Sequence, residues 1–69
     1  MFSKITFGER LLLLRKAAGE TQADVASLLS VTPIQISDME NEKTATSLER
    51  FVLICEHYHV SADYLLGLK

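Results

Sequence analysis

The sequence has few of the features that tie a small protein together or anchor it. One cysteine among 69 residues excludes an internal disulfide, so the fold must be stabilised by packing, alone or with a partner. The apolar runs, such as Leu11 to Leu14, are far shorter than the roughly 20 residues that cross a bilayer. The N-terminus lacks the apolar stretch and cleavage site of a signal peptide. We therefore expect a soluble cytoplasmic protein.

Positive charge is also scarce. Seven lysine and arginine residues stand against nine acidic residues, which gives a formal net charge of −2. This balance does not by itself indicate a nucleic-acid partner, because DNA and RNA phosphates attract basic surfaces. The hydrophobic fraction of 48%, in contrast, is ample for the core of one small domain.

The sequence carries no sign of an enzyme. His57 and His59 are two residues apart, so on a helix they point to different faces, and no third metal ligand has a paired spacing. The sequence has no glycine-rich phosphate loop. It also shows no serine and histidine accompanied by an acidic residue at a suitable position, as a catalytic triad requires. Cys55 lies among apolar residues and is predicted to be a buried, inert thiol. We expect no catalytic residue, metal, cofactor or small-molecule substrate.

What the sequence does contain is a series of helix signals. Threonine begins a capping box at residues 6–9, 21–24 and 32–35, in which its oxygen accepts the amide three residues on and the fourth residue reaches back. Gly19 and Gly67 are placed to end helices, since glycine adopts the left-handed conformation without penalty. No stretch alternates with the period of two that is typical of a strand. The prediction is one all-α domain.

The predicted domain covers residues 1–69 and is a compact bundle of five helices. These helices are expected over residues 7–18, 22–29, 33–41, 48–58 and 62–66. Helical spacing of apolar residues predicts which side chains face the core. They are Phe7, Leu11, Leu14, Ala18, Val25, Ala26, Leu29, Val31, Ile36, Met39, Leu48, Phe51, Val52, Cys55 and Tyr58.

Residues 19–40 are the most informative part of the chain. A glycine stop is followed by a short helix, a tight turn at Ser30 to Thr32 and a second short helix that begins at Pro33. This order is typical of a helix-turn-helix, whose second helix can lie in the DNA major groove.

Residues 7–67 resemble a known family on a set of spaced residues. The matching residues are Arg10-Leu11, Leu14-Arg15, Thr21-Gln22, Ala26, Leu29, Val31-Thr32, Ile36-Ser37, Glu40, Ser47-Leu48-Glu49, Val60-Ser61 and Leu65-Leu66. Together they resemble the five-helix DNA-binding domain of phage repressor and Cro proteins, the xenobiotic-response-element-like regulators. The resemblance implies a lambda-repressor-like fold and a transcriptional regulator that binds double-stranded operator DNA.

The resemblance also implies roles for particular residues. Gln22, Asn41 and Lys43, with Arg10 from the first helix, are expected to contact DNA phosphates. Base edges are expected to be read from the second helix of the motif, by Pro33, Ile34, Gln35, Ser37 and Asp38. Arg15 and Glu40 are expected to form a partly buried ion pair that fixes the orientation of that helix.

The expected reading surface departs from the family pattern. Pro33 offers no hydrogen-bond donor, Ile34 can make only apolar contacts, and Asp38 repels phosphate. Residues 21–46 hold one lysine against four acidic residues, a net charge of −3. Two functions therefore stay open. One is sequence-specific regulation of transcription through the major groove. The other is a helix-turn-helix domain with weak or lost DNA affinity that acts as a protein-interaction module, for example by sequestering a related regulator.

Three leucines lie outside the expected core stripes. Leu12, Leu13 and Leu53 occupy positions where the family usually has polar residues. Surplus apolar residues on a small surface suggest self-association, and a two-fold symmetric operator requires a dimer. These leucines are predicted to form the contact of a homodimer.

Overall fold

The computed structural model describes residues 4–41, 43–44 and 46–68, and all regular structure in this part of the chain is helical. The helices are α1 (Lys4–Ala17), α2 (Gln22–Leu29), α3 (Pro33–Glu40), α4 (Leu48–Tyr58) and α5 (Ala62–Leu66). The all-α, five-helix fold is therefore as predicted, and α2 and α3 form the helix-turn-helix.

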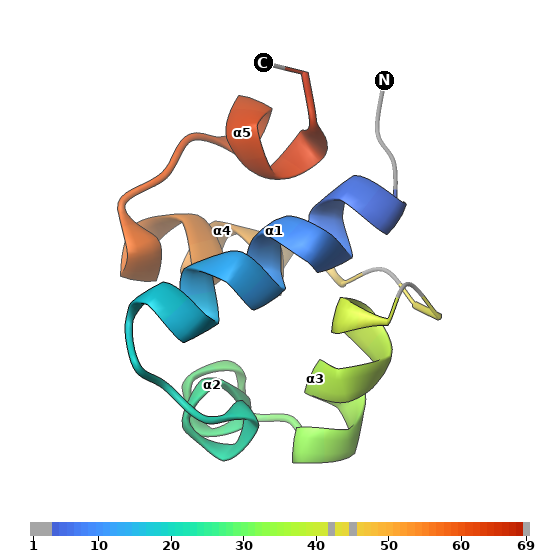
Figure 1. Cartoon of the computed structure of the whole chain (residues 1–69), viewed down its shortest axis with the longest axis vertical. Coiled ribbons are helices and arrows are strands. Elements are labelled where there is room, and N and C mark those ends of the chain that lie inside the picture. Colours follow the sequence, from blue (N-terminus) through green and yellow to red (C-terminus); the bar gives the residue numbers. More distant parts are fainter. Residues whose placement is uncertain (1–3, 42, 45, 69) are drawn as a thin grey trace.

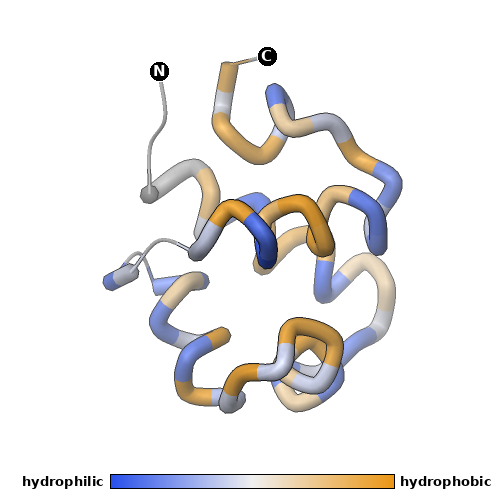
Figure 2. Tube along the Cα trace, turned by 180° about the vertical axis from the view of Figure 1, so that it is seen from behind, coloured by the Kyte–Doolittle hydropathy of each residue, from blue (hydrophilic) through white to orange (hydrophobic). Residues whose placement is uncertain are grey.

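The five helices surround one core. Figure 1 shows α1 across the middle with α4 behind it, α5 at one end of the molecule, and α2 and α3 at the other. Seen from behind in Figure 2, apolar residues occur along every helix. The fully buried apolar side chains come from all five helices: Phe7, Leu11, Val25, Ala26, Leu29, Ile36, Met39, Ile54 and Leu65.

The starts of α2 and α3 are fixed by local hydrogen bonds. Thr21 Oγ1 accepts from the amide of Asp24 at 3.1 Å, and the Asp24 carboxylate accepts from the Thr21 amide at 2.9 Å. Thr32 and Gln35 make the same reciprocal pair at 3.2 and 2.9 Å. Such a box satisfies two amides that the helix leaves without partners. The turn between the helices passes through Ser30 in the left-handed conformation, with φ 58°.

The prediction for the start of the first helix was wrong. The helix begins at Lys4 rather than Phe7, so Thr6 lies within it and cannot be its N-cap. Gly8, which lies within the predicted capping box at residues 6–9, has a different role. A Cβ atom there would lie 2.5 Å from the Met39 carbonyl oxygen and 2.9 Å from that of Glu40. Gly8 therefore allows α1 to touch the end of α3, and this packing outweighs the local capping signal.

The prediction for the inner face of α4 was also wrong in part. Leu48 and Val52 are 79% and 46% exposed, whereas Ile54, which was not assigned to the core, is completely buried. Two apolar stripes on this helix fit the helical period, so the sequence alone does not select between them. Packing against α2 and α5 selects the stripe that contains Phe51 and Ile54. The assignment of Ala18 to the core was wrong as well, because α1 ends at Ala17 and Ala18 is exposed.

Candidate nucleic-acid interface

The outer side of α3 is open to solvent. Ile34 is 73% exposed, and Pro33 and Gln35 are exposed beside it, while Ser37 and Asp38 are half-buried. The oxygen of the Gln35 side chain is already used in the cap of Thr32. The five residues predicted to read bases therefore share one helix, but Gln35 has a structural task as well.

Arg15 and Glu40 join α1 to the end of α3 in the ion pair that the resemblance implies. Arg15 Nε donates to Glu40 Oε2 at 2.6 Å, and Nη2 donates to Oε1 at 3.2 Å. Their side chains are only 11% and 3% exposed. The hydrogen bond to Glu40 is the main reason that the pKa of Arg15 is raised. A two-point contact between planar groups holds α3 in one orientation.

Gln22 belongs to the same network. Its side-chain amide donates to Glu40 Oε1 at 3.0 Å, so the buried carboxylate accepts hydrogen bonds from both α1 and α2. Gln22 is half-buried at the first position of α2. This bond fixes the side chain beside the N-terminal amides of the helix. A phosphate can be bound there by those amides and by the second N–H of the Gln22 amide.

Glu20 completes the network, although no local sequence pattern predicts this role. Its carbonyl oxygen accepts from Arg15 Nη1 at 3.0 Å. Its carboxylate accepts from the Tyr58 hydroxyl at 2.6 Å and lies 2.6 Å from His57 Nε2. The Tyr58 hydrogen bond is the main cause that lowers the pKa of Glu20, and burial is the main cause that raises the pKa of Tyr58. The end of α4 thus holds the segment that supports Arg15.

Arg10 lies elsewhere. Its Nη1 donates to the Tyr64 carbonyl oxygen, and its guanidinium stacks 4.4 Å from the centre of the Tyr64 ring. Tyr64 belongs to α5, which lies at the opposite end of the molecule from α2 and α3 in Figure 1. The Arg10 side chain therefore joins α1 to α5, at the opposite end of the molecule from the helix-turn-helix. This position argues against the expected contact between Arg10 and a DNA phosphate.

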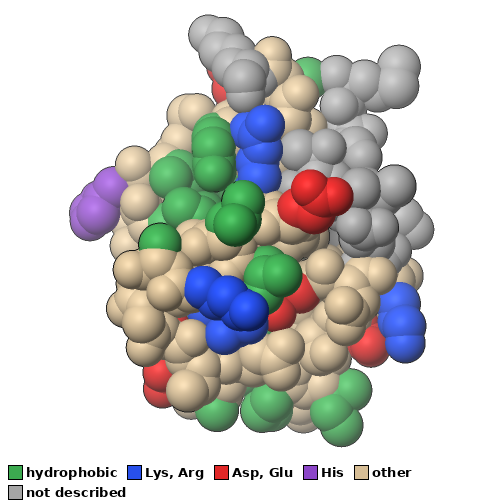
Figure 3. Space-filling view, in the orientation of Figure 1, with side chains coloured by type: hydrophobic (Ala, Val, Ile, Leu, Met, Phe, Trp, Pro, Cys, Tyr) green, Lys and Arg blue, Asp and Glu red, His purple; other side chains and the backbone are tan. Residues whose placement is uncertain are grey.

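Asn41 and Lys43 lie at the C-terminal end of α3. Asn41 Nδ2 donates to Ser37 Oγ at 3.2 Å, and the Lys43 amide donates to the Asp38 carbonyl at 2.9 Å. Both side chains are exposed. They therefore remain accessible to a DNA backbone. On the face seen in Figure 3, basic and acidic side chains are interspersed, without an extended basic patch.

The leucines predicted to form a dimer contact lie on two helices. On α1, Leu13 is 61% exposed and Leu12 is half-buried; on α4, Leu53 is 36% exposed. Leu53 lines a shallow apolar groove together with Leu48 and Val52. The α4 surface therefore offers more exposed apolar area than the sequence predicted, because two residues assigned to the core lie on it.

The described residues offer neither a metal site nor a membrane span. Within residues 4–41, 43–44 and 46–68, no three histidine, cysteine or acidic side chains gather in a way that could hold a metal ion. In the same ranges, no helix combines the length and apolar character needed to cross a membrane. Cys55 is half-buried, and burial raises the pKa of its thiol.

Comparison with known proteins gives consistent results. The Helix-turn-helix family model matches residues 11–65. Two regulators of Bacillus subtilis (strain 168) are similar in sequence. The HTH-type transcriptional regulator ImmR is 32% identical over 63 residues, which are 91% of this chain and 50% of ImmR. The uncharacterized HTH-type transcriptional regulator YobD is 33% identical over 60 residues, 87% of this chain and 54% of YobD. The chain thus spans about half the length of these relatives.

A solved structure has the same arrangement of helices. The P22 c2 repressor protein, crystallised with synthetic operator 9T in the presence of Tl⁺, aligns with a TM-score of 0.83 and 28% sequence identity. The alignment covers 91% of this chain and 96% of the repressor chain.

Proposed function

Because the chain belongs to the helix-turn-helix family of phage repressor and Cro-type regulators, we propose that it regulates transcription by inserting α3 into the major groove of an operator. It acts as a DNA-binding domain rather than as an enzyme, and it acts in the cytoplasm. The P22 c2 repressor structure is a complex with a synthetic operator, which supports double-stranded DNA as the partner of this chain.

The observation that carries the proposal is the way in which α3 is held. A buried carboxylate, Glu40, ties the end of α3 to Arg15 and to Gln22. The opposite side of the helix remains exposed at Pro33 and Ile34. A fixed helix with an open outer side is what major-groove reading requires, since base contacts depend on a defined docking geometry.

Each exposed residue then has a proposed role. Gln22 binds one DNA backbone through its free N–H and the helix amides, while Asn41 and Lys43 contact phosphates beyond the end of α3. Ile34 contacts a thymine methyl, and Asp38 accepts from a cytosine amino group. Pro33, Gln35 and Ser37 shape the reading surface beside them. Because this surface has few cations, non-specific affinity should be poor.

We further propose that the DNA-bound form is a homodimer. Two copies of α3 read two half-sites of a symmetric operator, and the second copy doubles a small set of phosphate contacts. The exposed leucines supply the apolar surface for this contact. Leu13 lies on α1, and Leu53 lies on α4 beside Leu48 and Val52.

Selection from random duplex DNA tests the proposal, followed by fluorescence anisotropy on the selected and scrambled duplexes. Lys43→Ala should weaken binding to both duplexes alike and lower the salt slope by about 0.9 per bound subunit. Asp38→Ala should strengthen binding to the scrambled duplex, because it removes a charge that repels phosphate. It should also relax the preference at one base pair. An unchanged salt slope in Lys43→Ala would remove that phosphate contact.

The acidic character of the motif supports one second candidate. From Thr21 to Thr46, four acidic residues face a single lysine, and phosphate repels such a surface. If no duplex is bound even at low salt, and Pro33→Arg gains no affinity, the domain acts as a protein-interaction module instead. It would then sequester a related regulator through the same folded unit.

A further inference from the structure

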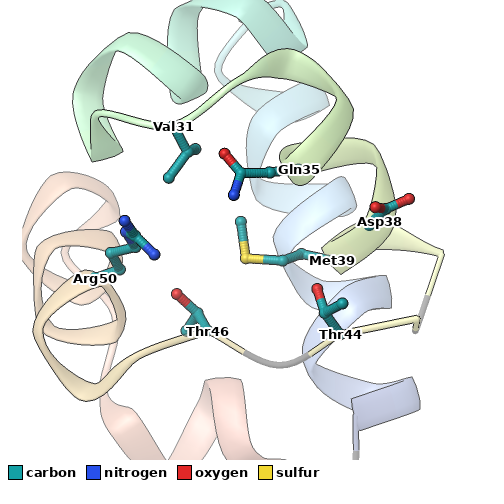
Figure 4. Close-up of a pocket in the computed structure, with 7 residues that line it drawn as sticks. All are labelled: Val31, Gln35, Asp38, Met39, Thr44, Thr46 and Arg50. Carbon is teal, nitrogen blue, oxygen red and sulfur yellow. The ribbon is translucent and has the colours of Figure 1, made fainter.

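A hollow lies on the side of α3 that faces α4. Gln35 and Asp38 border it from α3, Thr44 and Thr46 from the segment after α3, and Arg50 from α4. Figure 4 shows Gln35 and Arg50 pointing toward one another across this space, whereas the Asp38 carboxylate points away from it. The guanidinium of Arg50 therefore lies near the edge of α3, which carries acidic residues.

Arg50 has a fixed position but an unused charge. Its backbone amide donates to Ser47 Oγ at 3.3 Å in the N-cap of α4, so the side chain starts from a rigid first turn. Its guanidinium makes no hydrogen bond or ion pair with any residue that the structure describes. A half-buried arginine has five N–H donors, and buried donors are normally satisfied. The charge is therefore available for a ligand.

A second polar group at the hollow is also unsatisfied. Thr46 Oγ1 is buried and has no hydrogen-bond partner among the described residues. Figure 4 shows this oxygen directed toward the hollow. A hydroxyl and a guanidinium that face the same space without partners are suited to an anion, to which both can donate.

The position of the hollow relative to Gln22 favours a DNA phosphate as the anion. Gln22 bonds Glu40, which faces α1, and the hollow lies on the side of α3 that faces α4. A helix in the major groove has one sugar-phosphate backbone on each side. If Gln22 lies at one backbone, the hollow lies at the other.

We propose that Arg50 binds a phosphate of the second DNA backbone and so offsets the acidic charge of α3. Thr46 donates to the same phosphate, and Gln35 limits the space from the side of α3. This inference rests on the proposed function. It explains how a motif with a single lysine can bind a polyanion, because Arg50 lies outside the motif in sequence but beside it in space. Arginine is suited to the task because its planar fork matches phosphate geometry.

The test compares Arg50→Ala and Arg50→Lys with the wild type, using anisotropy on the selected and scrambled duplexes over a range of salt. Arg50→Ala should weaken binding to both duplexes by about tenfold, the loss of one charge-assisted contact. It should lower the salt slope by about 0.9 per subunit, and Arg50→Lys should restore the slope. Lys16→Ala is the control. It removes the same charge from an exposed position on α1 that does not line the hollow.

Other outcomes overturn the inference. An unchanged salt slope with loss of preference at one base pair would make Arg50 a base reader instead. Equal effects of Arg50→Ala and Lys16→Ala would reduce its role to net charge. A fall in melting temperature that Arg50→Lys does not reverse, with an unchanged salt slope, would make it a packing residue. If the wild type binds and Arg50→Ala binds equally well, only this inference fails, whereas a wild type that binds no duplex removes the proposed function as well.

Discussion

Arg15→Ala should destabilise the domain because it leaves a buried carboxylate short of donors. The Glu40 side chain is 3% exposed and accepts two hydrogen bonds from Arg15 and one from Gln22. After the substitution only the Gln22 bond remains, and water has little access. Removing one partner of a fully buried ion pair costs about 3–5 kcal/mol, and an unsatisfied buried group costs about 1–3 kcal/mol.

The remaining Gln22 bond places the expected loss in the lower range, at about 1–3 kcal/mol. A domain of this size is stable by roughly 3–10 kcal/mol, so the loss is a large share of the total. A loss of about 2 kcal/mol would lower the melting temperature by roughly 8–16 °C. Circular dichroism at 222 nm during heating, with urea unfolding alongside, measures both quantities.

Two comparisons make the measurement decisive. Lys16→Ala removes a neighbouring, exposed cation from the same helix and should change stability little. Glu40→Gln should cost less than Arg15→Ala, because the amide oxygen still accepts a hydrogen bond from Arg15. A melting curve of Arg15→Ala that overlays the wild type would refute the structural role of this ion pair.

Three further substitutions test other contacts. Gly8→Ala should lower the free energy of unfolding by about 1–3 kcal/mol, since its Cβ meets backbone oxygens at 2.5 and 2.9 Å; a stabilised variant would show that α1 can shift. Tyr58→Phe should raise the midpoint pH of acid unfolding. The hydrogen bond from Tyr58 is the main cause that lowers the pKa of Glu20 in the folded state. This lowered pKa stabilises the fold at pH values above the unfolded-state pKa of Glu20, and the stabilisation is lost as the pH falls through the folded-state pKa. An unchanged acid transition in Tyr58→Phe would contradict this. Leu53→Glu should give monomers in sedimentation with unchanged helix content, and Leu13→Glu tests the α1 surface in the same way; dimers in both variants would exclude these contacts.

The helix-turn-helix could be predicted because its signals are local. The capping boxes at Thr21 and Thr32, and Pro33 at the first helical position, act within a few residues of one another. In these caps, side chains a few residues away accept hydrogen bonds from the first backbone amides of the helix. The sequence alone therefore predicts where the helix starts. The ion pair between Arg15 and Glu40 was accessible only through the family resemblance, because its members are 25 residues apart.

The other features of the fold and of the candidate interface depend on tertiary packing. The inner stripe of α4 could not be chosen from the sequence, since two stripes that contain Leu48 or Ile54 fit the same period. Glu20 gives no local signal because its partners lie 37 and 38 residues away. The position of Arg50 is not predictable from the sequence for a similar reason. It follows the motif in sequence, and only the fold brings it beside Gln35.

The most direct test of the account is the affinity of the purified chain for duplexes selected from random DNA, measured by fluorescence anisotropy at low and physiological salt. Helix-turn-helix reading predicts a clear preference for the selected duplex over its scrambled counterpart. The affinity should fall as salt rises, and the bound species should contain two copies of the chain. Equal and negligible binding of both duplexes at low salt would contradict it, and would assign the folded domain to protein contacts instead.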